Sequence, residues 1–201
     1  DLIMVDRNSS SNLVWFKNQG NGVFSAAQEI YNFGTDWNQS IEQFEIVDID
    51  NDNDLDIASV TVFSGKVIQF INDGTQSFSM EIIDHAGSFD SWIASIDIEN
   101  DGYPEIISES VFYPNNSGTI DSNAVSVGEN GYSAVVNDFT GDGFDDLAMF
   151  TYMDDIVLFE NNGAGSFNAP QKIDSLLDFG YYWMSVCDLD KDGKKDILYP
   201  S

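Results

Sequence analysis

The chain has 201 residues and is strongly acidic, with 35 Asp and Glu residues against 7 Lys and Arg residues and a formal net charge of −28. This charge argues against binding to nucleic acid or to an anionic membrane surface, because both need basic patches. The single cysteine, Cys187, excludes an internal disulfide, and no apolar run reaches the length of a membrane span. The length suffices for one domain with a substantial core.

In chain order, the first predicted elements are a strand at the N-terminus and a hairpin at 16–24. The hairpin begins with Phe16, has Asn two residues later, continues through glycines and ends with Phe24. Related phrases recur at 70–78 and 159–167. Because Asn and Gly adopt turn conformations at low cost, each phrase predicts a strand, a tight turn and a second strand.

Acidic loops alternate with these hairpins, and the first loop is 48–56, Asp-Ile-Asp-Asn-Asp-Asn-Asp-Leu-Asp. Similar loops follow at 97–105, 138–146 and 188–196, with oxygen-bearing side chains at loop positions 1, 3, 5 and 9 and with Gly or Asn at position 6. Carboxylates this close together repel one another, whereas Ca²⁺ takes six to eight oxygen ligands. The pattern predicts about four Ca²⁺ sites, one per loop, in which position 7 offers its backbone carbonyl. Acidic turns that only solvate the surface are the alternative.

An EF-hand loop also begins D-x-D-x-D-G, but it needs a bidentate Glu at position 12. Position 12 is occupied here by Ser59, Ser108, Met149 and Tyr199. The residues that follow position 9, such as 57–63, are also β-formers rather than helix formers. Each loop is therefore predicted to lead into a strand.

The loops begin at residues 48, 97, 138 and 188, at intervals of 49, 41 and 50 residues. Between the first two loops the pattern predicts strands at 55–63, 66–71, 77–83 and 91–96, and it predicts no helix. Repeats of this length with short strands predict an all-β fold in which β-propeller blades of four antiparallel strands follow one another. The expected units of this single domain are 1–56, 56–105, 105–146 and 146–196, with the start of a further blade at 196–201.

Two parts of the repeat pattern are irregular. Unit 105–146 lacks the Phe-x-Asn-x-Gly phrase and is polar at 115–123, so we expect a reduced blade that lacks one strand. The two ends of the chain resemble each other, and Asp1 stands where position 9 of another loop would be. This duplication predicts a segment of a larger propeller, with a closed ring of four blades as the alternative.

These motifs resemble the FG-GAP or VCBS repeat, the blade of the integrin α-subunit β-propeller. The family pattern D-x-[DN]-x-D-G-x-x-D-[IL] is matched at 188–197, and its hairpin N-x-G-x-G-x-F is matched at 161–167. The resemblance covers the chain except for about 105–136. It implies that each loop joins the first two strands of a blade and binds Ca²⁺, and propellers of this family commonly have seven blades.

Carried over residue by residue, the resemblance implies a metal ligand at each oxygen-bearing loop position and at the position 7 carbonyl. Glu99 is longer than Asp and crowds its site, and Thr140 offers only a neutral hydroxyl, so the third site is expected to be the weakest. The implied ligands are Asp48, Asp50, Asp52, Asp54 and Asp56; Asp97, Glu99, Asp101, Tyr103 and Glu105; Asp138, Thr140, Asp142, Phe144 and Asp146; and Asp188, Asp190, Asp192, Lys194 and Asp196.

The first functional hypothesis is a calcium-stabilised binding or adhesion module that recognises protein or glycan at the cell surface or in the extracellular space. Millimolar calcium outside cells suits loops of about 10⁻⁴–10⁻³ M affinity, and related propellers serve adhesion in integrins and sugar binding in some fungal lectins. Aromatic side chains near a propeller mouth could contact the ligand, although packing between blades is the alternative for each. The candidates are Trp37, Trp92, Tyr181, Tyr182 and Trp183.

Two other functions remain as hypotheses. A structural spacer in a large surface adhesin or fibre fits an acidic, repeat-built chain nearly as well. An enzyme that acts on polysaccharides fits less well, because the chain has a single histidine, His85, and no catalytic constellation is evident. We therefore expect no catalysis, no insertion into a membrane and no binding to nucleic acid. The oligomeric state is not predicted.

Overall fold

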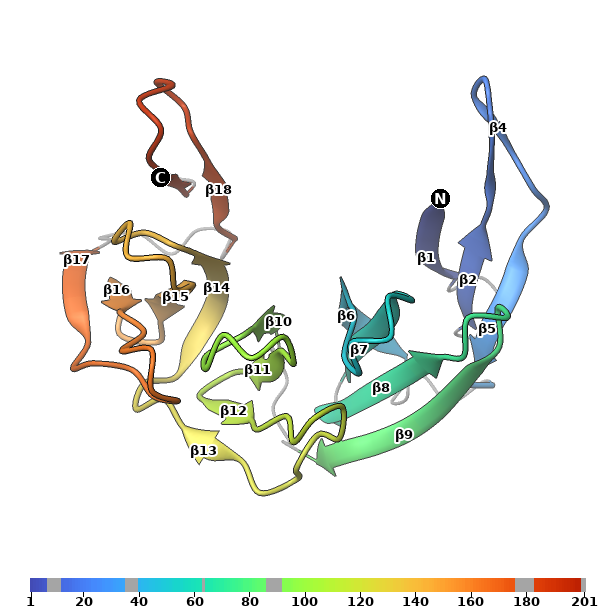
Figure 1. Cartoon of the computed structure of the whole chain (residues 1–201), viewed down its shortest axis with the longest axis horizontal. Coiled ribbons are helices and arrows are strands. Elements are labelled where there is room, and N and C mark those ends of the chain that lie inside the picture. Colours follow the sequence, from blue (N-terminus) through green and yellow to red (C-terminus); the bar gives the residue numbers. More distant parts are fainter. Residues whose placement is uncertain (7–11, 35–39, 63, 86–91, 176–182, 200–201) are drawn as a thin grey trace.

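The computed structural model describes residues 1–6, 12–34, 40–62, 64–85, 92–175 and 183–199. Among these residues it contains strands and turns and no helix, so none of its elements could cross a membrane as a helix. The strands form antiparallel sheets that follow one another along an open arc (Figure 1). The prediction of an all-β chain of antiparallel propeller blades is confirmed.

Three sheets have four strands each, in simple chain order, and a three-stranded sheet precedes them. A two-stranded sheet follows them, and a small ribbon projects from the first sheet. The sheets are β1 (Leu2–Asp6), β2 (Asn12–Phe16) and β5 (Gln28–Asn32); β6 (Ile41–Val47), β7 (Asp56–Thr61), β8 (Lys66–Asn72) and β9 (Phe78–His85); β10 (Ile93–Ile96), β11 (Glu105–Ser108), β12 (Val111–Tyr113) and β13 (Val125–Ser126); β14 (Gly131–Asn137), β15 (Asp146–Thr151), β16 (Asp155–Phe159) and β17 (Gln171–Ser175); β18 (Ser185–Cys187) and β19 (Asp196–Leu198); and the ribbon β3 (Asn18–Gly20) and β4 (Val23–Phe24).

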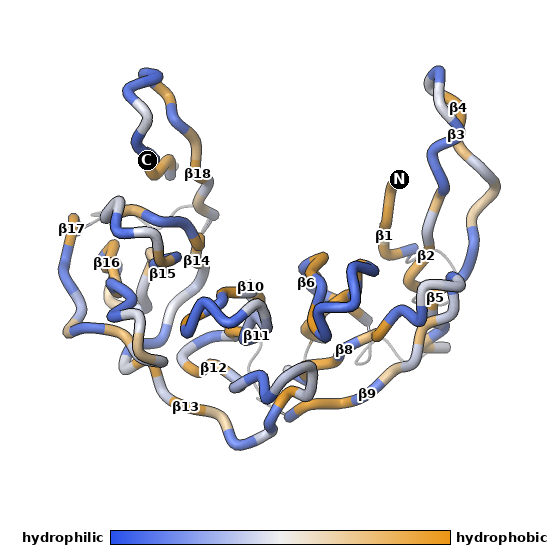
Figure 2. Tube along the Cα trace, in the orientation of Figure 1, coloured by the Kyte–Doolittle hydropathy of each residue, from blue (hydrophilic) through white to orange (hydrophobic). Residues whose placement is uncertain are grey.

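The second strand of each four-stranded sheet is buried along its whole length. Every residue of β7, β11 and β15 is buried, including the acidic residue that opens each strand and the serine or threonine that ends it. A strand of this kind is covered on both of its faces. In Figure 2 the acidic turns are hydrophilic, and the hydrophobic residues lie mainly in the strands.

The hydrophobic core is divided into three clusters, and each cluster lies between two successive sheets. Ile57, Ile68 and Phe70 pack against the sheet that contains Leu13. A second cluster joins β7 and β8 to β11 and Tyr113 of β12, and a third joins β10 and β11 to β15 and β16. The first strands also meet, because β10 contacts both β6 and β14, toward the concave side of the arc in Figure 1.

The sheets are offset from the sequence units. Each four-stranded sheet begins with the strand before an acidic loop, so the strand predicted at 91–96 opens the next sheet as β10 instead of closing its own. The acidic loops therefore join first and second strands, β6 to β7, β10 to β11, β14 to β15 and β18 to β19. This connection agrees with the one that the family resemblance implied.

The sheet that contains most of 105–146 keeps four strands, so the expected loss of a strand is wrong. The reduction is in length, because β12 has three residues and β13 has two. The polar stretch 115–123 forms the turn between them, and within it Asn115 and Ile120 pair in an isolated antiparallel bridge. The shorter interval between the second and third acidic loops therefore reflects shorter strands and not a missing strand.

Trp92 belongs to the core. Its side chain is 3% exposed, it packs in the cluster between the sheets of β10 and β14, and its indole Nε1 donates to the Gly131 carbonyl at 2.8 Å. The expected ligand contact is therefore wrong for this residue, and packing between blades accounts for it.

Candidate metal centre in the acidic loops

The four acidic loops are numbered 1 to 4 in chain order, as 48–56, 97–105, 138–146 and 188–196, and all have one backbone conformation. The position 1 carboxylate accepts the N–H of position 6, and the position 5 carboxylate accepts the N–H of position 7. In loop 1, Asn53 donates to Asp48 at 3.0 Å, and Asp54 donates to Asp52 at 2.8 Å. These bonds hold the side chains of positions 1 and 5 against a tight turn.

Two residues in each loop have a positive φ. Position 6 does so as predicted, with Asn53 at 72° in loop 1. Position 4 also does so, although nothing was predicted for it, and φ is 58° at Asn51, 55° at Asn100 and 64° at Lys191. Asn tolerates this region better than most residues. Lys191 does not have that advantage, so its conformation reflects the hydrogen bonds around it.

In loops 1 to 3 the position 9 carboxylate joins its strand to its own loop and to the hairpin that follows. In loop 1, Asp56 is fully buried and accepts the N–H of Ile49 at position 2 and the N–H of Asn72 in the following hairpin, both at 2.8 Å. Glu105 in loop 2 and Asp146 in loop 3 make the equivalent bonds. Asp1 accepts the N–H of Asn18 in the same way at 2.8 Å. Position 9 therefore holds the fold together as well as facing the loop.

Loops 1 and 4 bring three carboxylates together. One oxygen each of Asp48, Asp50 and Asp56 lies within 4.8 Å of the others, and Asp188, Asp190 and Asp196 do the same. In each group one buried oxygen, Oδ1 of Asp50 and Oδ1 of Asp188, has no hydrogen-bond partner among the described residues. A buried carboxylate oxygen without a donor is costly. Such an oxygen among other carboxylates is what a hard divalent cation would satisfy, so these two donor sets fit Ca²⁺.

Position 3 of loops 1 and 2 is covered by the hairpin of the next sheet. The turn that contains Gly118 passes so close to loop 1 that a Cβ there would lie 3.0 Å from Asp50 Cβ. The turn with Gly165 approaches loop 2, where a Cβ would lie 2.6 Å from Glu99 Oε1. Both glycines also have a positive φ, so no other residue fits easily. This contact accounts for the burial of Asp50 Oδ1.

The pKa values of Asp50, Asp56 and Glu105 lie above the ordinary range of a carboxyl group. Burial raises the pKa of Asp56 to about 6, with smaller contributions from the charges of Asp50 and Asp52. Burial, with the charge of Glu99, raises the pKa of Glu105 to about 7. Burial and the charges of Asp52 and Asp48 raise the pKa of Asp50. Carboxyls with raised pKa values favour folding at low pH and oppose it as the pH rises through those values, unless a cation is bound.

Loops 2 and 3 differ at position 3, where the sequence has Glu99 and Thr140. Both loops keep the turn geometry, with Gly102 donating to Asp97 at 2.8 Å and Gly143 donating to Asp138 at 3.0 Å. The groups of three converging carboxylates found among the described residues are those of loops 1 and 4. The ranking of the sites by affinity therefore stays a prediction, with loop 3 the weakest.

Among the aromatic candidates, Trp183 is 55% exposed and is available for a contact. Trp37, Tyr181 and Tyr182 lie outside the described residues. Tyr103 and Phe144 at position 7 are half-buried, so their side chains pack locally while their carbonyls belong to the loops.

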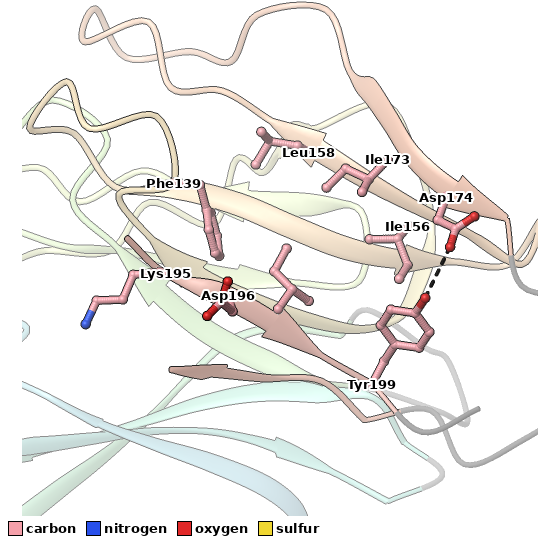
Figure 3. A pocket seen from close by; sticks show the side chains of 9 residues that line it. Phe139, Ile156, Leu158, Ile173, Asp174, Lys195, Asp196 and Tyr199 are labelled. Carbon is pink, nitrogen blue, oxygen red and sulfur yellow. Dashed lines mark hydrogen bonds between the residues drawn. The ribbon is translucent and has the colours of Figure 1, made fainter. Parts of the chain in front are cut away.

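An apolar groove of about 390 Å³ runs between β16 and β17 on one side and β19 on the other (Figure 3). Ile156, Leu158 and Ile173 line one wall, and the Tyr199 hydroxyl donates to Asp174 at 3.1 Å across one end. Asp196, position 9 of loop 4, borders the groove and is only partly buried. Loop 4 is therefore less enclosed than loops 1 and 3.

Sequence reasoning missed one residue of the repeat, Asn115. Its backbone N–H donates to Glu105 at 3.3 Å, as that of Asn161 donates to Asp146 at 2.9 Å, so it occupies the hairpin Asn position of its sheet. The signal that would have found it is an aromatic residue two positions earlier. Tyr113 precedes Asn115 as Phe159 precedes Asn161, and both rings are fully buried.

Replacement of Asp50 by Asn should change stability in opposite directions with and without calcium. In chelator we expect the melting temperature to rise by about 2–4 °C, because the substitution removes a charge beside Asp48 and Asp52 whose Oδ1 is buried without a hydrogen-bond partner among the described residues. In millimolar calcium we expect it to fall, because a ligand is weakened. Thermal melting in both buffers measures this, with Glu160→Gln as the control for an exposed carboxylate. A shift of the same sign in both buffers would contradict the assignment of Asp50 as a ligand.

Comparison with known proteins supports the repeat assignment. A family model described as FG-GAP-like repeat matches residues 1–59, 48–108 and 138–199. Among solved structures, a lectin of Agrocybe aegerita described as recognising non-reducing terminal N-acetylglucosamine matches with a TM-score of 0.57 and 22% identity over 77% of this chain and 46% of that chain. The Photorhabdus luminescens Tc holotoxin pore matches with a TM-score of 0.41 and 14% identity over 97% of this chain and 12% of that chain.

The chain thus spans less than half the length of the lectin, and no curated protein matches it. The lectin match shows a shared fold. The three family matches together cover most of the sequence and include loops 1 to 4, and the matched segments contain the hairpins at 16–24, 70–78 and 159–167. The chain therefore belongs to the family of FG-GAP-like repeat proteins.

Proposed function

We propose that this chain is a calcium-stabilised β-propeller module that binds a glycan or protein ligand outside the cell. The observation that carries the proposal is the donor set of loops 1 and 4. In each, three carboxylates converge, and one buried oxygen has no hydrogen-bond donor among the described residues. Each loop would hold one Ca²⁺. For loops 2 and 3 the support is the turn geometry that they share with loops 1 and 4.

Calcium would act on structure. In loop 1 the ligands are the carboxylates of positions 1, 3, 5 and 9 and the carbonyl of Asp54, and the other loops use the equivalent positions. A cation that binds only the folded loop stabilises the fold. Loops of this exposed kind suit millimolar calcium, which supports a location in the extracellular space or at the cell surface.

A hollow of about 230 Å³ with both polar and apolar walls is a candidate site for a sugar. Its walls combine serine hydroxyls, the Glu129 carboxylate and the ring of Tyr152, and it lies between the sheet of β12 and the sheet of β14. Hydroxyls and a carboxylate suit the hydroxyl groups of a sugar, and an aromatic ring suits its apolar face. The Agrocybe aegerita lectin, which shares this fold, makes N-acetylglucosamine the first ligand to test. Trp183 is a second candidate contact.

A glycan array, probed with the protein in calcium and again in chelator, tests the proposal. We expect binding to terminal sugars in calcium, and at least tenfold weaker binding of Tyr152→Ala or Trp183→Ala in follow-up titration. Leu2→Ala, an exposed apolar residue on the first sheet, is the control. Absence of binding to every glycan and to cell-surface proteins, together with assembly into filaments, would instead favour a structural spacer.

We further propose that the segment is not catalytic. The proposal rests on the sequence, which has one histidine, and on the roles of the acids. The loop carboxylates are engaged by backbone N–H groups, and outside the loops Asp155 pairs with Lys172 at 2.7 Å. Incubation with the glycan that binds best, followed by analysis of the products, tests this. Cleavage that is lost on mutation of a loop-distal acid would overturn it.

A further inference from the structure

The acidic loops of neighbouring sheets are connected by buried asparagine side chains. Asn115 is 7% exposed and Asn161 is 1% exposed. The amide Nδ2 of Asn161 donates to the Asp145 carbonyl of its own loop 3 and to the Ile98 carbonyl of loop 2, each at 3.1 Å. Asn115 does the same one sheet earlier, to Pro104 of loop 2 at 3.0 Å and to Ile49 of loop 1 at 2.8 Å.

These side chains complete a continuous hydrogen-bonded path across three loops. Ile49 and Ile98 stand at position 2, where each N–H is held by the position 9 carboxylate of its own loop at 2.8 and 2.9 Å. The carbonyl of each accepts the next asparagine, whose backbone N–H reaches the following position 9 carboxylate. The path runs in order through Asp56, Ile49, Asn115, Glu105, Ile98, Asn161 and Asp146.

A second set of contacts also joins the hairpin of one sheet to the acidic loop of the preceding sheet. In each of these hairpin turns the asparagine Oδ1 accepts a backbone N–H. Asn115 Oδ1 accepts that of Gly118 at 2.8 Å, and Asn161 Oδ1 accepts that of Gly163 at 2.9 Å. The same turns reach position 3 of the preceding loop through the close approaches of Gly118 to Asp50 and of Gly165 to Glu99. A hairpin therefore contacts its own loop at positions 8 and 9 and the preceding loop at positions 2 and 3.

We infer that Asn115 and Asn161 are positioning residues that couple loops 1, 2 and 3, so that these loops bind calcium cooperatively. This inference rests on the proposed calcium binding and adds its regulation. When one loop is ordered by a cation, its position 2 and position 9 groups are fixed. The neighbouring hairpin is then held through hydrogen bonds already in place, and the next loop loses less conformational freedom when it binds.

Replacement of Asn161 by Ala tests the coupling at loop 2, where Tyr103 at position 7 sensitises the luminescence of bound Tb³⁺. Titration with Tb³⁺, and competition by Ca²⁺, should show at least fivefold weaker binding at loop 2 and a Hill coefficient closer to one than in the wild type. The matched control is Asn72→Ala. The Asn72 amide reaches the Leu55 carbonyl of its own loop 1 at 3.3 Å, and no preceding loop lies beside it among the described residues.

Wild-type affinity and cooperativity in a folded Asn161→Ala protein would overturn the coupling. Failure of the wild type to bind Tb³⁺ or Ca²⁺ at all would overturn the proposed calcium function instead, so the two failures are distinguishable. Should Asn161→Ala unfold, the double variant Asp138→Asn, Asp142→Asn disables loop 3 without touching the core. We then expect weaker binding at loop 2 and faster hydrogen exchange at the Ile98 amide, and unchanged values for both would overturn the inference.

Discussion

Removal of calcium should lower the melting temperature by about 15 °C or more. A site of about 10⁻⁴ M affinity in 2 mM calcium contributes about 1.8 kcal/mol, and four such sites contribute about 7 kcal/mol. For a domain of about this size, 1 kcal/mol corresponds to about 2–4 °C. The physical source is the relief of repulsion among carboxylates that converge within 4.8 Å in loops 1 and 4.

Differential scanning calorimetry in 2 mM calcium and in chelator measures this shift. Magnesium is the control, because its smaller octahedral shell does not match a loop with so many protein oxygens. Restoration by calcium and not by magnesium is the expected result. Equal melting temperatures in calcium and chelator would show that the acidic turns are solvated surface and hold no ion.

Replacement of Asp146 by Ala should have the largest effect of any single loop substitution, a loss of about 3–5 kcal/mol. Asp146 is fully buried, and it accepts the N–H groups of Phe139 at 3.0 Å, Thr140 at 3.1 Å and Asn161 at 2.9 Å. The substitution leaves these donors unsatisfied, and each buried unsatisfied group costs about 1–3 kcal/mol. Most of the loss should persist in chelator, because it does not depend on a cation.

Denaturant unfolding in both buffers separates this role from that of a simple ligand. Asp142→Ala at position 5 is the matched variant, because Asp142 is exposed and accepts one N–H, from Phe144 at 2.9 Å. We expect Asp142→Ala to cost less than about 1 kcal/mol in chelator and more in calcium. If the two variants lose equal stability in chelator, the position 9 carboxylate is no more important to the fold than the exposed ones.

The loops and strands were predictable because their signals are local. Oxygen-bearing side chains at positions 1, 3, 5 and 9 and a turn residue at position 6 identify each loop, and the β-forming residues after position 9 identify β7, β11 and β15. The positive φ at position 4 of loop 4 was not predictable, because lysine, here Lys191, is not a typical turn residue. The extra role of position 9 was also hidden, since its partners Asn72 and Asn161 lie 15 or more residues away.

The burial of Trp92 and the role of Asn115 depend on how neighbouring sheets pack against each other, and a single sequence does not show this packing. Trp92 and Trp183 stand at the same distance before a loop, but Trp92 meets a neighbouring sheet and is buried, whereas Trp183 is exposed. Asn115 does not stand in the Asn-x-Gly phrase of its counterparts, and it shares with them only the buried aromatic residue two positions before it. Its position became recognisable from its contacts with Glu105 and with Ile49 of the preceding loop.

The division of the core into three clusters, each shared by two sheets, has a consequence for unfolding. Among the residues that the structure describes, no cluster spans the whole arc, so a sheet is stabilised by its immediate neighbours and not by a common centre. Sheets β6–β9 and β10–β13 each contribute to two clusters, whereas the sheet of β1 and the sheet of β14 each contribute to one. In such a linear array a sheet that is held on one face opens more readily than a sheet that is held on both, so that the backbone amides of β7 and β11 are the last to exchange with solvent.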